Sequence, residues 1–273
     1  MPKVKANKLS LNYEQQGSGE PLILIPFLTA ENACYAFQVA EYAKHFTCIS
    51  IDLRGTGESD KVNEAYTTED LADDVAAVMQ ALNISSAHIT GLSLGAGVGL
   101  CLGVRYPEKV KSLSVHSGWT RTDLFLETVI KSWQVSARAL NSIQELAIQN
   151  IFPWCFTPNL YAEKPDYVQS LADFIKSRPA MSIDDFILQS NAVLAHNIEE
   201  RLGSITAPTQ ITFGAYDMIT STRFARPMQE RIRNQELVIF EECSHAGLYE
   251  NVEEFNQKTL AFLQRNRSIA ATG

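Results

Sequence analysis

Two patterns of apolar residues alternate along most of the chain. Continuous apolar runs bounded by turn residues are typical of strands covered on both faces, as in parallel sheets. Such a run occupies residues 21–27, further segments predicted as strands occupy residues 46–53, 110–117, 208–214 and 237–241, and a more alternating strand pattern occupies residues 9–14. Apolar residues at helical spacing occupy residues 33–45, 67–82, 221–231 and 252–265. The alternation predicts an α/β fold with a doubly wound, mostly parallel sheet, whose site lies at the carboxyl ends of the strands.

The pattern changes between residues 119 and 203. Strand-like runs disappear there, and helical spacing with many aromatic residues replaces them. We therefore predict that residues 119–203 form an inserted helical cap, and that residues 1–118 and 204–273 form the core. Residues 268–273 should fray beyond the last helix.

A serine lies at one junction between a predicted strand and a predicted helix. A run rich in β-branched residues leads into Gly91-Leu92-Ser93-Leu94-Gly95, and helical spacing then continues to Tyr106, before Pro107. This segment fits Gly-x-Ser-x-Gly, in which the serine occupies a sharp turn and the two glycines avoid a clash. The helix N-terminus favours the negative charge that develops in acyl transfer. We predict that Ser93 is a nucleophile.

A serine hydroxyl becomes a good nucleophile only when a base removes its proton. His245 lies just past the last predicted strand and is the candidate base. The histidines at 45, 88 and 196 lie at positions typical of structural residues, whereas His116 ends a predicted strand and is expected to line the pocket.

The base in turn needs an acid that holds its tautomer. Asp217 follows the strand at 208–214, and the order serine, acid, histidine along the chain is that of a known type of triad. Asp123 follows an earlier strand and is the alternative acid, although it is better placed to cap the first cap helix.

An oxyanion hole requires two backbone N–H groups directed at the developing charge. Leu94, directly after the candidate nucleophile, should supply one of them. The second should come from the loop after the strand at 21–27, where Leu28 is our choice and Phe27 the alternative. Most cap aromatics should form the core of the cap, and the remainder should line an apolar pocket above Ser93. For that pocket we select Phe27, His116, Trp119, Phe125 and Trp133.

Composition narrows the classes of partner. A chain of 273 residues with 45% hydrophobic and 20% charged residues is typical of globular proteins. Its net charge of −8 makes nucleic acid and anionic membrane surfaces poor partners. No apolar segment follows the first charged residues and no run is long enough to span a bilayer, so we expect a cytoplasmic protein without a signal peptide.

The cysteines at 34, 48, 101, 155 and 243 show no C-x-x-C pair and no metal-ligand spacing, which favours buried, reduced thiols and no metal.

Four segments together resemble the α/β-hydrolase fold family: residues 52–59, 91–95, 214–217, and 244–246 with Glu250 and Phe255 behind them. The resemblance covers nearly the whole chain apart from the cap. Within the family, residues 35–38 and 44–46 are most similar to 3-oxoadipate enol-lactonases and related serine carboxylesterases. The chain departs from the family at Pro26-Phe27, where many members have His-Gly.

We therefore expect a serine hydrolase without a cofactor, which cleaves a small carboxylic ester or lactone through Ser93, His245, Asp217 and an acyl-enzyme. One alternative is a hydrolase of C–C bonds in β-diketone-like substrates. Family members with that activity have a tryptophan after the catalytic histidine and an arginine in the pocket. Here Ala246 follows His245, and we expect Arg121 to be a solvated charge. The second alternative is a ligand sensor that keeps the triad without catalysis.

Overall fold

The computed structural model describes residues 2–268; Met1 and residues 269–273, which include most of the predicted frayed end, lie outside the described residues. Within residues 2–268, eight strands form one sheet in the order β1-β2-β4-β3-β5-β6-β7-β8. The strands are β1 (Lys3–Ala6), β2 (Leu9–Gln16), β3 (Glu20–Ile25), β4 (Phe46–Ile51), β5 (Ala87–Leu92), β6 (Val110–His116), β7 (Thr209–Gly214) and β8 (Gln235–Phe240).

Strands β3 to β8 run parallel, whereas β1 and β2 pair antiparallel at one edge. The predicted doubly wound, mostly parallel sheet is therefore confirmed. Strand β1 was not predicted, because the lysines of Lys3–Ala6 interrupt any apolar run.

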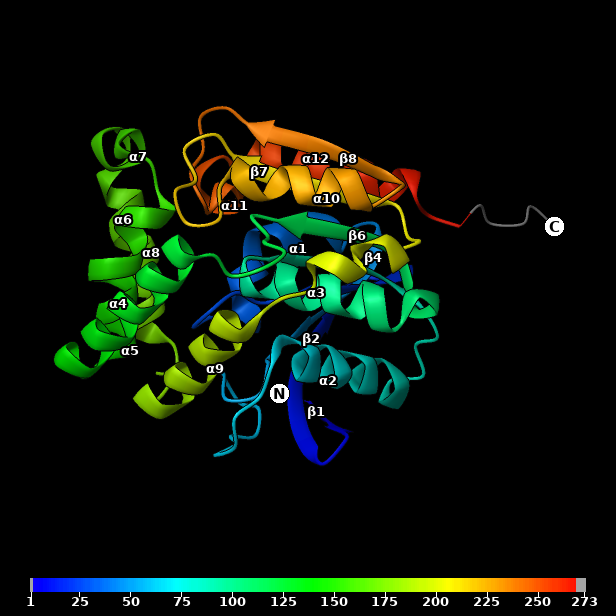
Figure 1. Cartoon of the computed structure of the whole chain (residues 1–273), viewed down its shortest axis with the longest axis horizontal. Coiled ribbons are helices and arrows are strands. Elements are labelled where there is room, and N and C mark those ends of the chain that lie inside the picture. Colours follow the sequence, from blue (N-terminus) through cyan, green and yellow to red (C-terminus); the bar gives the residue numbers. More distant parts are fainter. Residues whose placement is uncertain (1, 269–273) are drawn as a thin grey trace.

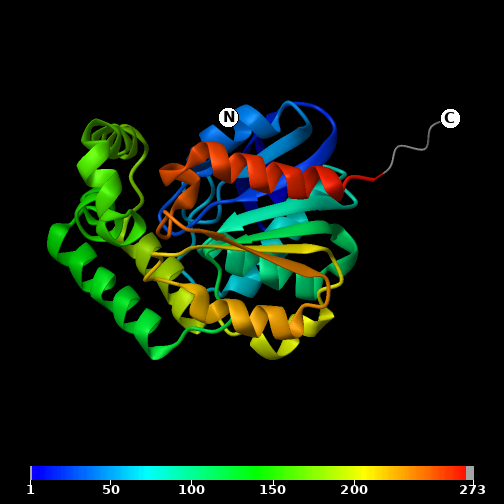
Figure 2. The same cartoon turned by 90° about the horizontal axis from the view of Figure 1, so that it is seen from above.

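Helices cover both faces of the sheet (Figure 2). One face carries α1 (Ala36–Tyr42) and α12 (Val252–Arg265), and the other carries α2 (Thr68–Ala81), α3 (Leu94–Arg105) and α10 (Ala225–Arg231). The shorter turns of helix are η1 (Asn32–Tyr35), η2 (Pro107–Lys109), η4 (Glu199–Ser204), η5 (Thr222–Phe224) and α11 (Gly247–Glu250).

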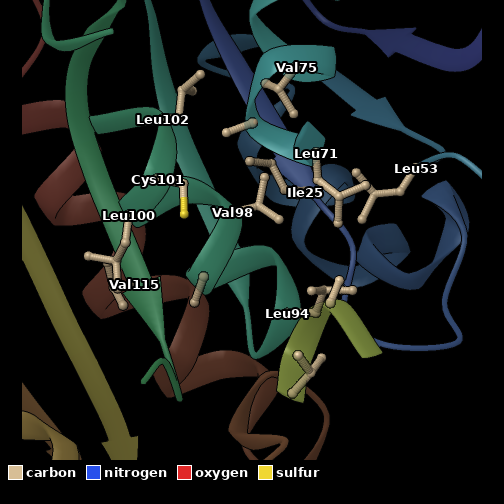
Figure 3. Close-up of a cluster of buried hydrophobic side chains, with 14 of the residues drawn as sticks. Ile25, Leu53, Leu71, Val75, Leu94, Val98, Leu100, Cys101, Leu102 and Val115 are labelled. Atoms are coloured by element: carbon tan, nitrogen blue, oxygen red, sulfur yellow. The ribbon is translucent and has the colours of Figure 1, made fainter. Parts of the chain in front are cut away.

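The buried side chains of a strand alternate between these two faces, as the pleat requires. On β3, Leu22 and Leu24 pack in the cluster that contains residues of α1 and α12. Ile23 and Ile25 pack in the larger cluster with α2 and α3. Figure 3 shows part of this larger cluster, in which side chains of α2 and α3 surround Ile25. The continuous apolar run of β3 is thus explained by burial on both faces.

The chain between β6 and β7 forms a group of helices at one end of the sheet (Figure 1). We call α4 to α9 the cap helices. They are α4 (Leu124–Leu140), α5 (Ile143–Leu146), the π-helical turn η3 (Ala147–Ile151), α6 (Phe152–Cys155), α7 (Pro158–Glu163), α8 (Pro165–Ser177) and α9 (Ile183–Ala195). The arrowhead of β8 points toward the cap helices, so the carboxyl ends of the parallel strands face them (Figure 1). Within residues 2–268, no helix combines the length and apolarity needed to cross a membrane.

The strand order changes direction between β3 and β5, which lie side by side at the centre of the sheet. The connection from β3 leads to β4 on one side, and the chain then returns to β5 on the other side. In open α/β sheets, the crevice beyond such a switch point is where ligands bind. The loops after β3 and β5 therefore define the place where a site is expected.

Candidate active site

Ser93 occupies the sharp turn between β5 and α3, in a strained conformation. Its φ of 52° and ψ of −117° lie outside the regions that non-glycine residues usually adopt. A Cβ on Gly91 would collide with the carbonyl of Gly95, and a Cβ on Gly95 would collide with the carbonyl of Ile25. The two glycines therefore allow the turn to close against β3.

The turn is held by hydrogen bonds from neighbouring strands. The Ser93 N–H donates to the His116 carbonyl of β6 at 2.9 Å. The buried hydroxyl of Tyr35 donates to the Ile25 carbonyl of β3 and accepts from the Leu92 N–H of β5, both at 2.9 Å. Hydrogen bonds that involve β3 and β6, the two neighbours of β5, thus hold Ser93 in its strained conformation.

Asp217 and His245 form a buried pair beyond the ends of β7 and β8. His245 Nδ1 lies 2.9 Å from Asp217 Oδ2. The Asp217 Oδ1 atom accepts from the N–H groups of Ile219 at 2.8 Å and Thr220 at 3.0 Å. Burial raises the pKa of a carboxyl, but at Asp217 the His245 imidazole and hydrogen bonds from His245 and Thr220 outweigh it and lower the pKa to about 2. The carboxylate is therefore ionised and favours the His245 tautomer that carries its proton on Nδ1.

Two residues with hydroxyl side chains, which the sequence analysis missed, lie against the Asp217–His245 pair. Thr220 Oγ1 lies 2.9 Å from Asp217 Oδ2, 2.9 Å from the Ser117 carbonyl and 3.3 Å from His245 Nδ1. The Ser117 hydroxyl donates to the His245 carbonyl at 2.9 Å. The Ser117 hydroxyl thus attaches the histidine loop to the end of β6, and Thr220 Oγ1 lies between the Asp217–His245 pair and the Ser117 carbonyl.

The histidine loop is also attached to the cap helices. The Glu250 carboxylate accepts from the Ser244 N–H and, at 2.6 Å, from the Thr157 N–H. The Ala246 N–H donates to the Cys155 carbonyl at 3.0 Å. The position of the histidine loop therefore depends on the segment that joins α6 to α7.

The loop after β3 presents an unpaired backbone donor. The Leu28 N–H of this loop and the Leu94 N–H at the start of α3 donate to no other described residue, whereas the Phe27 N–H is directed at the Cys34 thiol. The next amide, that of Thr29, donates to Gln189 Oε1 of α9 at 3.0 Å, and Thr29 adopts a positive φ of 70°. The Leu28 N–H is therefore free to bind a ligand, while a hydrogen bond to α9 holds the next residue, Thr29, in place.

Ser93 and His245 line the same cavity, which encloses about 140 Å³ between the sheet and the cap helices. Its wall is mainly apolar, and three of the predicted pocket residues, Phe27, Trp119 and Trp133, belong to it. Among residues 2–268, no group of three or more His, Cys, Asp or Glu side chains is arranged to hold a metal ion.

The prediction that His116 lines the pocket is wrong. Its ring bonds Thr90 through Nε2 at 2.9 Å and Thr212 through Nδ1 at 2.8 Å, and it packs 4.8 Å from the Phe255 ring. On β6, Leu113 and Val115 face α3, so the alternation of side chains turns His116 toward α12 and away from the cavity.

The prediction for Phe125 is also wrong. Its side chain is 46% exposed and does not belong to the cavity wall. The buried face of α4 carries Leu126, Ile130 and Trp133, which recur at helical spacing and line the cavity. Phe125 precedes that face by one residue, and a step of one position turns a helical side chain by about 100°.

Other charged and polar candidates lie away from the cavity. Asp123 accepts from the Leu126 N–H at 2.8 Å and caps α4, as predicted, and it pairs with Arg223. Arg121 is exposed and outside the cavity wall. The wall nevertheless holds one charged pair that the sequence analysis missed, Glu31 and Arg178.

The structure is similar to solved α/β hydrolases. It superposes on MGS-M2, an alpha/beta hydrolase enzyme from a Medee basin deep-sea metagenome library, with a TM-score of 0.89 and 21% identity. That match covers 99% of this chain and 100% of the other chain. At this identity the likeness concerns the fold.

Curated relatives extend the similarity to the sequence. A putative carbamate hydrolase RutD from Caulobacter vibrioides is 26% identical over 260 residues, with 93% of this chain and 95% of the relative covered. A 3-oxoadipate enol-lactonase 1 from Acinetobacter baylyi is 26% identical over 271 residues, with 94% and 93% covered.

The family model described as the alpha/beta hydrolase fold matches residues 21–252. This range contains the Ser93 turn, the Asp217–His245 pair and the cap helices between them. The chain therefore belongs to the α/β-hydrolase fold family.

Proposed function

We propose that this protein is a serine hydrolase that cleaves a carboxylic ester or lactone through an acyl-enzyme. One observation carries the proposal: the strained Ser93 and the Asp217-bonded His245 line a single, mainly apolar cavity. This arrangement supplies a nucleophile, a base with a fixed tautomer and a place for the acyl group.

In the first half of the reaction, Ser93 Oγ attacks the substrate carbonyl while His245 Nε2 takes the hydroxyl proton. Asp217 holds the ring and stabilises the imidazolium that forms. The negative charge on the carbonyl oxygen is bound by the N–H groups of Leu94 and Leu28, with Phe27 as the alternative to Leu28. The dipole of α3 also favours that charge, because Leu94 is its first residue.

The tetrahedral intermediate then collapses, and the bond to the leaving oxygen breaks. His245 returns its proton to that oxygen, which leaves as an alcohol or, in a lactone, remains attached to the acyl chain. Water repeats the sequence on the acyl-enzyme, with His245 as its base, and releases the acid and free Ser93. The proposed steps require no cofactor.

The cavity supports a small and mainly apolar substrate. Its volume of about 140 Å³ is close to that of an engineered cavity of ~150 Å³ that binds benzene. A short acyl chain or a small lactone ring suits this volume. The name of the enol-lactonase relative supports a lactone, and the name of the carbamate hydrolase relative adds carbamates to the compounds worth testing.

Cleavage of C–C bonds is less well supported. The residue after His245 is the small Ala246, which lines the cavity, and Arg121 lies outside it. The arginine that does reach the wall, Arg178, is engaged by Glu31.

The test is a panel of p-nitrophenyl esters of increasing acyl length, simple lactones, a carbamate and a dienol ketone, assayed on the wild type and Ser93→Ala. We expect turnover of short esters or a lactone, and a loss of kcat of roughly 10⁴-fold or more in the variant. Efficient C–C cleavage with no ester turnover would contradict the proposal. Tight ligand binding without turnover of any compound would instead favour the sensor.

A further inference from the structure

Two charged side chains interrupt the apolar cavity wall. Glu31 and Arg178 are the acidic and basic side chains, histidine aside, that the described residues contribute to it. Glu31 lies in the loop after β3, and Arg178 directly follows α8. Arg178 is therefore the basic side chain that could attract an anionic substrate to this wall. Whether it does so depends on whether its guanidinium is already paired.

The pair is bidentate. Arg178 Nε donates to Glu31 Oε1 at 2.8 Å, and Nη2 donates to Oε2 at 3.0 Å. This fork geometry is the stronger form of charge-assisted hydrogen bond. The side chains are 30% exposed for Arg178 and 11% exposed for Glu31, so water screens the pair only in part. The hydrogen bond that Arg178 donates to Glu31 also raises the pKa of Arg178.

Hydrogen bonds to the backbone at or next to each residue hold both members of the pair in place. On the cap side, Gln144 Nε2 donates to the carbonyls of Ile175 at 3.1 Å and Arg178 at 2.9 Å. On the sheet side, the Asn32 N–H donates to Asp52 Oδ1 at 2.7 Å, directly after Glu31. The pair is thus preorganised, and neither side chain is carried by a free loop end.

Among the described residues of this wall, a substrate carboxylate finds no free cationic partner. It must lose its hydration in mainly apolar surroundings, which is costly without a new ionic partner. The guanidinium that would serve as that partner already has its fork occupied by Glu31. Displacing Glu31 would leave a carboxylate that is only 11% exposed without its cation.

We propose that Glu31 is a specificity-determining residue that masks Arg178, so that the cavity selects esters and lactones whose acyl part carries no negative charge. The inference rests on the proposed function and names its substrate class. It predicts that removing the Glu31 charge exposes the Arg178 guanidinium and creates a preference for anionic acyl groups.

The test compares p-nitrophenyl hexanoate with mono-p-nitrophenyl adipate, which has the same acyl length and a terminal carboxylate. The readout is the ratio of their kcat/KM values, because a general loss of activity cancels in the ratio. We expect the wild type to favour the hexanoate by about tenfold or more, and Glu31→Gln to reduce this ratio about tenfold. Glu31→Ala also removes the carboxylate that pairs with Arg178, so it should lower the ratio in the same direction. In Glu31→Gln/Arg178→Gln the ratio should return toward the wild-type value, because no cation remains.

The matched control is Glu145→Gln. Glu145 pairs with Lys176 at 3.0 Å, with side chains 36% and 49% exposed, and it is outside the cavity wall. The change removes the same charge near the same helix, so the ratio should stay within about twofold of the wild type. Thermal unfolding of each variant establishes that it is folded.

Two results would overturn the masking role. One is a wild type that hydrolyses the adipate monoester as fast as the hexanoate, and the other is an unchanged ratio in both folded Glu31 variants. Failure of the proposed function gives a different result, since neither ester would then show turnover that depends on Ser93.

Discussion

Asp217 accepts four hydrogen bonds, from His245 Nδ1, Thr220 Oγ1 and the N–H groups of Ile219 and Thr220. Burial raises the pKa of Asp217, but the electrostatic interaction with His245 and these hydrogen bonds outweigh it and lower the pKa to about 2. Its role in the proposed reaction is therefore to stay charged and to hold one tautomer of His245, and not to exchange protons itself.

The first prediction concerns the identity of the acid. Asp217→Asn should lower kcat on a p-nitrophenyl ester by about 10³- to 10⁴-fold, because an amide no longer selects the Nδ1-protonated tautomer. Asp123→Asn is the matched control, since asparagine also caps a helix well and only the exposed pair with Arg223 is lost. Steady-state kinetics on both variants would show the assignment to be wrong if Asp123→Asn had the larger effect.

At this scale, the sequence identified the residues that lie in recognisable local patterns. Ser93 is flanked by glycines, and Asp217 and His245 follow strands in the expected order. Thr220 carries no such signal, because a threonine three positions after an aspartate is ordinary in any loop. Glu31 and Arg178 are 147 positions apart, so only the fold reveals that they meet.

The helix α9 connects the cap to the loop that presents the free Leu28 amide. Gln189 is fully buried on α9, and its Oε1 accepts from the Thr29 N–H directly after Leu28. Thr29 has a positive φ, so this hydrogen bond holds a turn that the backbone disfavours. The cap helices thus contribute to the geometry of the site in addition to covering it.

The second prediction tests this connection. Gln189→Leu should lower kcat about 10- to 100-fold with little change in KM, because a displaced oxyanion donor weakens binding of the transition state more than of the substrate. Gln189→Glu keeps an acceptor oxygen and should retain more of the activity.

Gln134→Leu serves as the control for Gln189→Leu. It removes bonds from α4 to Ser190 and Asn191 of α9, without touching the loop after β3. An equal loss of kcat in both leucine variants would mean that α9 acts through general stability and not through Thr29.

Helical elements were predicted better than the direction of their side chains. The spacing of Leu126, Ile130 and Trp133 already marks the buried face of α4, and applying it strictly would have excluded Phe125. For His116, counting the alternation along β6 from Leu113 and Val115 would have placed the ring on the α12 face. Both errors came from selecting residues by type and not by register.

The interior of the protein buries His116 and His196, which have no part in the proposed reaction. Burial lowers the pKa of His116 to about 3, and burial also lowers that of His196 to about 4. Both histidines are therefore neutral in the folded protein at pH values where an unfolded histidine is protonated.

The third prediction follows from this difference. Between the unfolded pKa near 6.5 and the lower folded values, the unfolded state binds more protons, so stability falls as the pH falls. From pH 7 to pH 5, each of these histidines should lower the free energy of unfolding by about 2 kcal/mol. Urea unfolding of the wild type and His116→Gln at both pH values measures the effect. The variant should lose less stability on acidification, and an identical loss in both proteins would contradict the account.

For the whole molecule, the sequence predicted the class of fold but not the order of the strands in the sheet. The run of β3 is continuously apolar, as in parallel strands covered on both faces, whereas β4, β5 and β6 are almost wholly buried although polar residues interrupt them. The arrangement that puts β3 beside β5 comes from long-range pairing, which no local pattern encodes. That arrangement is what brings the amides after β3 to the Ser93 turn.

The most direct test of the central claim is covalent labelling of Ser93. The wild type is treated with a fluorophosphonate, and the intact mass and the modified peptide are determined by mass spectrometry. We predict a single adduct on Ser93, loss of ester turnover in proportion to labelling, and no adduct on Ser93→Ala. Undiminished labelling of Ser93→Ala, or an adduct on another residue that abolishes turnover, would show that Ser93 is not the nucleophile.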